Sequence, residues 1–156
     1  MSFLAGGYTA TWNSLALGQT AEGHRLAHQI FGQGIKGDTY GQTVQDEVIQ
    51  GAEMFIEFTL IEANAAAVET LKWPISATKW TIGSTGFTAV GSSLAKSLVL
   101  TAVAGTPGAA APASITCAKS MLATGYPVQI LYGPSLRDIP IRMRVYPNSG
   151  VFAVET

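Results

Sequence analysis

The chain has 156 residues, of which 47% are hydrophobic and 12% are charged, and its net charge is −1. This length fits one domain, and the low charge predicts apolar surface of the kind that subunits bury in assemblies. The balanced charge argues against a protein that coats nucleic acid. No run of about 18 apolar residues is present, and the first residues lack the basic start and apolar centre of a signal peptide. We therefore expect an intracellular chain with no membrane partner.

Hydrophobic and polar residues alternate over most of the chain, which is typical of half-buried β-strands. In the first half, this pattern predicts strands at 8–12, 24–31 and 53–60, with residues 15–18 following a turn after the first. Gly32 and Gly34 are expected to end or bulge the second strand, and a turn is expected at Gly51. The third strand has an apolar face for the core and a mixed face that carries Glu53 and Glu57.

The second half contains one predicted helix and further strands. The helix covers 64–73, where Asn64 can act as the N-cap and Pro74 stops it. Strands are predicted at 97–103, 114–122, 128–132, 137–146 and 151–154. Pro140 predicts an edge or bulge position for its strand. The pattern indicates a mostly β fold, a β-sandwich or barrel of seven or eight strands with one α-helix, in a single domain over 1–156.

Few residues of the sequence are candidates for a catalytic or metal-binding site. Cys117 alternates with polar neighbours, so a buried hydrophobe is favoured over a nucleophile. His24 and His28 fall on one face of a strand, which favours surface or interface imidazoles over a metal pair. Asp46 and Glu47 are adjacent, so they point in different directions. We expect no enzyme, and no catalytic, cofactor or metal site.

The charges are unevenly distributed along the chain. Seven acidic residues and no Lys or Arg occur between Asp38 and Glu69. From Lys72 onward, seven basic residues face only Asp138 and Glu155. Two interpretations remain open. The charges pair within one fold, or opposite surfaces of a polar subunit attract one another and stack the subunits head to tail.

The order of motifs in the first 72 residues resembles that of tail tube proteins from long-tailed bacteriophages, of the non-contractile type. An aromatic N-terminal strand leads to Leu17-Gly18. A polar loop follows, then Asp46, a strand that ends at Glu62, and the predicted helix. The loop is similar to the Asp-x-Tyr-Gly-x-Thr signature of that family, in the residues Gly37, Asp38, Thr39, Tyr40, Gly41, Gln42 and Thr43. The segment 83–112, rich in Ala, Gly, Ser and Pro, matches no family motif, which indicates a surface embellishment or a cousin of the family.

The resemblance implies a subunit that forms hexameric rings, which stack into a hollow tube. Its expected partners are further copies of itself, the tape measure protein, the tail tip or baseplate proteins and the terminator. Double-stranded DNA would pass through without specific binding. The expected location is the virion tail, after assembly in the host cytoplasm.

Site residues follow from combining the resemblance with the charge pattern. The loop 37–43, together with Asp46, is the expected ring-stacking contact. Glu57, and after it Glu53, are expected to line the lumen, although a solvated outer face fits equally well. The basic partners of the loop are expected to be Arg137, Arg142 and Arg144.

Two other functions remain open. The chain could be a tail terminator or a head-decoration protein, which forms one ring and stops. It could also be a β-sandwich module that binds a ligand through exposed aromatic residues, for which Trp12, Trp73 and Trp80 are candidates.

Overall fold

The fold is known from a computed structural model, which describes residues 7–61, 71–75, 90–103, 111–130 and 138–156. In these residues, eight strands form one antiparallel sheet with a single four-residue helix, α3 (Gly91–Leu94). The strands are β1 (Tyr8–Trp12), β2 (Leu15–Ala16), β3 (Thr20–Lys36), β4 (Val44–Leu60), β5 (Lys96–Ala102), β6 (Ser114–Leu122), β7 (Ile139–Val145) and β8 (Val154–Glu155). The prediction of a mostly β fold is confirmed.

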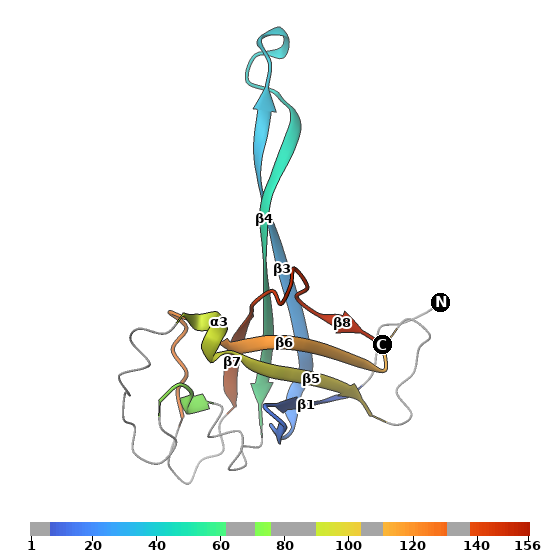
Figure 1. Ribbon diagram of the computed structural model, residues 1–156, viewed down its shortest axis with the longest axis vertical. Coiled ribbons are helices and arrows are strands. Elements are labelled where there is room, and N and C mark those ends of the chain that lie inside the picture. The colour runs from blue at the N-terminus through green and yellow to red at the C-terminus, as the bar shows by residue number, and fades with distance from the viewer. Residues whose placement is uncertain (1–6, 62–70, 76–89, 104–110, 131–137) are drawn as a thin grey trace.

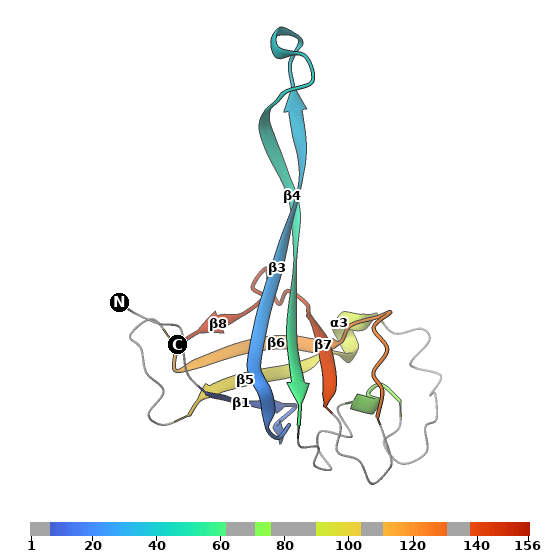
Figure 2. The ribbon, with the colours of Figure 1, turned by 180° about the vertical axis from the view of Figure 1, so that it is seen from behind.

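The sheet is bent into two halves. Its strand order is β2-β1-β5-β6-β7-β4-β3, and β8 pairs with β6. In both ribbon views, β1, β5 and β6 run across the molecule, whereas β3 and β4 run along it (Figures 1 and 2). The two halves join where Ser120–Leu122 of β6 pairs with Met143–Val145 of β7.

The hydrophobic core lies between the two halves of the sheet. Alternate residues of β1, β4, β5, β6 and β7 point into it, including Ile56, Leu98 and Met143, each 0% exposed. The Trp12 indole packs edge-on against Trp73 and donates a hydrogen bond to a backbone oxygen of β6. For β4, the core face predicted from the sequence alternation is confirmed, since Ile56, Phe58 and Leu60 are buried.

The hairpin of β3 and β4 is much longer than the sequence predicted. Each strand has 17 residues, and their outer parts project from the body as a two-stranded arm (Figure 1), which we define as residues 30–52, beyond the pairing of Met54 with Val145. The predicted turn at Gly51 is wrong, because Gly51 pairs with Phe31 inside the ladder. The expected irregularity at Gly32 is a bulge, where the register shifts between Phe31 and Gly32.

Other predictions need correction or lie outside the described residues. Residues 128–130 form no strand, and 131–132 are not described. Pro140 is not on an edge strand, because β7 lies between β6 and β4. It is tolerated there because β6 pairs only with Met143–Val145 and does not reach it. Of the predicted helix, Leu71 and Lys72 are helical and 64–70 are not described.

Candidate assembly surfaces

The arm exposes large apolar side chains that a monomer leaves in water. β4 illustrates this along a single strand, since Ile56 is 0% exposed in the body whereas Ile49 is 71% exposed in the arm. The exposed apolar residues of the arm are Ile30, Phe31, Ile35, Val44, Val48 and Ile49. Exposed apolar side chains gathered on both faces of one hairpin mark an interaction surface.

One face of the arm continues the core face of the hairpin. Leu26 pairs with Ile56 in the body, and because side chains alternate, Ile30 and Ile49 follow on the same face of the ladder. We call this the core-side face. It is locally flat because Gly32, which lies opposite Ile49, has no side chain. A Cβ added at Gly32 would lie 3.1 Å from the Val48 carbonyl oxygen. The face also carries His28, Glu47 and Lys36, and its apolar part around Ile30 and Ile49 is suited to close packing against another protein surface.

The predicted ring-stacking loop lies at the tip of the arm. A short 3-10 turn, η1 (Asp38–Tyr40), is followed by Gly41, whose φ of 63° favours glycine. The Lys36 ammonium donates a hydrogen bond to the Gln42 side-chain oxygen at 3.0 Å. Asp46 lies just beyond the loop and accepts a hydrogen bond from the Glu47 amide at 2.8 Å. The loop 37–43 and Asp46 are therefore presented together, away from the body.

The predicted lumen residues lie on the outer face of the sheet, where both form ion pairs. Glu53 accepts a hydrogen bond from the Arg144 guanidinium at 2.9 Å. The Glu57 Oε1 atom lies 3.4 Å from the Nε atom of Arg142. The Phe55 ring lies between the two pairs, with the Arg142 guanidinium 4.0 Å from its centroid. On this face, acidic and basic side chains alternate, so the surface is not purely acidic.

These pairs bear on the two interpretations of the uneven charge distribution. For Arg142 and Arg144, the partners are acidic residues of the same chain, as the internal-pairing interpretation expects. A stacking contact through either arginine would have to share or replace an existing ion pair. Arg137 lies outside the described residues.

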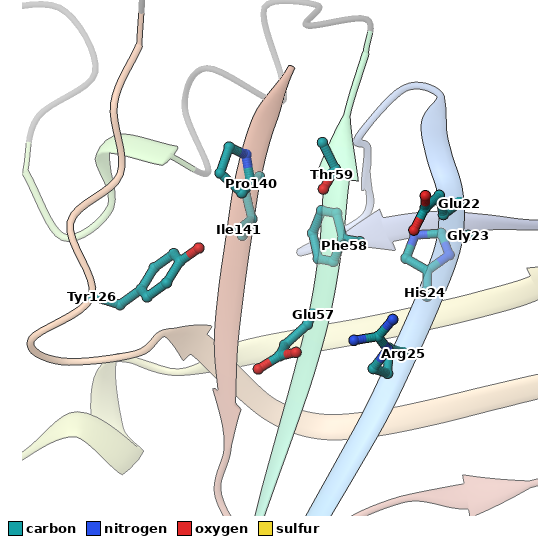
Figure 3. Close-up of a pocket in the computed structure, with 10 residues that line it drawn as sticks. All are labelled: Glu22, Gly23, His24, Arg25, Glu57, Phe58, Thr59, Tyr126, Pro140 and Ile141. Carbon is teal, nitrogen blue, oxygen red and sulfur yellow. The ribbon is translucent and has the colours of Figure 1, made fainter.

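A shallow cavity of about 450 Å³ lies beside this face, over β3, β4 and β7. Figure 3 shows Tyr126 on one side and Glu22 with His24 on the other, with Glu57 and Arg25 between them. Burial lowers the pKa of His24 from 6.5 to about 4, so the ring is neutral near pH 7. Neither ring nitrogen has a hydrogen-bond partner, and the ring packs against Phe58 at 5.1 Å.

The remaining candidate groups have structural surroundings. His28 shares the core-side face with His24, as predicted, but it is exposed. Cys117 is fully buried, and burial raises its pKa to about 11, which fits a buried hydrophobe. In the described part of the chain, no three His, Cys, Asp or Glu residues gather closely enough to hold a metal ion.

Comparison with models of known protein families and with curated proteins gives no match. None of the helices in the described ranges is long and apolar enough to cross a membrane. Function must therefore be argued from the surfaces themselves.

Sequence reasoning missed the arm, which carries six of the exposed large hydrophobic residues of the described chain. The signal was present, since Ile30 and Ile35 precede the predicted loop and Val48 and Ile49 follow it. It was hidden because the intervening glycines suggested turns, and because the bulge breaks the strict alternation.

Proposed function

We propose that this chain is a self-assembling structural subunit that forms hexameric rings stacked into the hollow tail tube of a bacteriophage. The observation that carries the proposal is the projecting arm with its exposed apolar side chains. The motif order of the first 72 residues, the mostly β fold and the low charge of the chain also support it.

The arm is unstable as an isolated feature, which gives assembly a physical cause. A two-stranded hairpin is marginally stable in water unless it packs against another element. Docking the arm on a neighbouring copy would bury its isoleucines and valines and would order both strands. Because the arm and its receiving surface are different parts of the molecule, the contact is heterologous and generates a ring or an open polymer.

In the proposed tube, the tip loop 37–43 and Asp46 contact the next ring. The outer face with Glu53 and Glu57 lines the lumen, where the tape measure protein and later double-stranded DNA pass. The paired arginines suit this role, because a guanidinium held by a carboxylate offers little net attraction to phosphate. The tail tip or baseplate and the terminator would cover the two ends of the tube.

Negative-stain electron microscopy of the purified protein over a range of concentrations tests the proposal. The matched variant replaces residues 31–51 by Asn-Gly, which closes the hairpin between the paired residues Ile30 and Ala52. We expect stacked rings or tubes from the full chain and folded monomers from the shortened one. Closed single rings would indicate a terminator or decoration protein, and monomers of the full chain at every concentration would reject self-assembly.

A further inference from the structure

The body of the molecule has an apolar cleft near the base of the arm. Its volume is about 260 Å³, and its wall comes from β1, β3, β5, β6 and β8 together with residues 111–112. These strands gather in the body, whereas the arm leads away from it (Figure 1). The residues that matter most for the argument are Tyr8, Leu26, Leu100, Ala111, Ile115 and Glu155.

The cleft is preformed, and most of its wall is apolar, although His24 and Glu155 also line it. The Tyr8 hydroxyl donates a hydrogen bond to the Pro112 carbonyl oxygen at 2.7 Å, which fixes one wall and satisfies its polar group. Leu26, Leu100 and Ile115 supply aliphatic surface. An apolar cavity gives water few hydrogen-bond partners, so an apolar side chain binds there more favourably.

We propose that this cleft receives the arm of a second copy of the chain, and that Ile49 and Ile30 of the core-side face enter it. This inference rests on the proposed function and names the receiving surface for the arm. The cleft would thus bind a flat β-hairpin through aliphatic side chains.

The chemistry of the two surfaces matches. Ile49 is the most exposed large hydrophobic residue of the described chain, at 71%. Gly32 and Gly34 lie on the same face, so this part of the hairpin can approach another surface closely. The core-side face also carries Glu47, two residues from Ile49, and Lys36 nearer the tip, so the match between arm and cleft rests on their apolar side chains.

The arm that enters the cleft belongs to another molecule. Leu26 lines the cleft of its own chain, and Ile30 lies four residues further along the same continuous strand. Four residues of strand span about 13 Å, and this distance leads outward from the body. Each copy thus has one donor arm and one separate acceptor cleft, which produces a head-to-tail chain of contacts.

Disulfide trapping tests the proposal in the assembled protein. The double variant Ile49→Cys/Ala111→Cys places one thiol on the core-side face of the arm and one in the cleft wall. The native Cys117 is fully buried and does not interfere. After mild oxidation with diamide, we expect a ladder of covalent oligomers on a non-reducing gel. A one-to-one mixture of the two single variants should give linked dimers if the double variant assembles poorly.

The matched control is Val48→Cys/Ala111→Cys, whose arm thiol lies on the opposite face of the same strand. It should cross-link roughly tenfold more slowly, because a disulfide requires the Cβ atoms to lie about 4 Å apart. Tubes without the Ile49–Ala111 link would overturn this receiving site and leave the proposed function intact. If neither tubes nor links form, both fail. A single closed dimer, or a link within one chain, would overturn the head-to-tail arrangement.

Discussion

Replacing Ile49 by Ala should separate assembly from folding. Ile49 and Ile56 are the same residue type on the same strand, but Ile49 is 71% exposed and Ile56 is 0% exposed. The same substitution at the two positions therefore removes identical atoms from a proposed interface and from the core. We expect Ile49→Ala to weaken assembly and Ile56→Ala to weaken the fold.

The magnitudes follow from the apolar groups removed. Ile→Ala deletes three carbon groups, each worth about 0.8 kcal/mol when buried, or about 2.4 kcal/mol in total. Since Ile49 is 71% exposed in the monomer, docking can recover about 1.7 kcal/mol of this. That loss raises the critical concentration for assembly roughly 20-fold. In the monomer, Ile49→Ala should change the free energy of unfolding by less than about 0.5 kcal/mol, against about 2–5 kcal/mol for Ile56→Ala.

Two measurements decide the outcome. Sedimentation at a series of protein concentrations gives the critical concentration of the wild type and of Ile49→Ala. Urea unfolding of dilute monomer gives the free energy of unfolding for both variants. An unchanged critical concentration in Ile49→Ala would refute the role of the arm. A loss of stability in Ile49→Ala as large as in Ile56→Ala would show instead that the arm is part of the core.

Three further predictions concern the body. His24 has a folded pKa of about 4 and an ordinary value of 6.5, so the unfolded state binds more protons between these pH values and stability falls as the pH is lowered through this window. The free energy of unfolding should fall by up to about 3 kcal/mol. The urea midpoint of the wild type should therefore be lower at pH 4.5 than at pH 7, and the difference should be much smaller in His24→Phe. An equal loss in the two proteins would contradict this. Cys117, fully buried with a pKa raised to about 11, should react with a thiol reagent at pH 8 only in urea. Fast labelling of the folded protein would contradict this. The partly exposed pair Glu53–Arg144 should give a coupling energy below about 1 kcal/mol in a double-mutant cycle with Gln at both positions, decreasing with salt. A larger, salt-independent value would mean that the pair is effectively desolvated.

The strands of the body could be predicted from sequence because each has one buried face. β7 shows this well, since its buried residues alternate, and β6 alternates in its first half; the ends of both were predicted to within about two residues. In the arm, neither face is buried by the chain itself. Strict alternation is therefore not required there. Gly34 was expected to end or bulge the strand and Gly51 to form a turn, although both lie within the ladder.

The charge pairs could not be assigned from sequence for a different reason. Glu53 and Arg144 are 91 residues apart, and only the pairing of β4 with β7 brings them together. Once that register is known, Glu57 opposite Arg142 follows directly, because cross-strand neighbours on one face interact. The sequence shows that acidic and basic residues lie in different segments of the chain. It does not show that the fold brings them together as ion pairs.

The two faces of the arm favour a stacked tube over a simpler assembly. The core-side face carries Ile30 and Ile49, and the opposite face carries Phe31, Ile35 and Val48, all of them exposed. One cleft on one neighbour can cover only one of these faces. Covering both requires each arm to lie between two other molecules, which an isolated dimer does not provide. In the proposed stack of rings, an arm would contact a neighbour in its own ring and a subunit of the next ring, so the tube is one arrangement in which both apolar faces leave water.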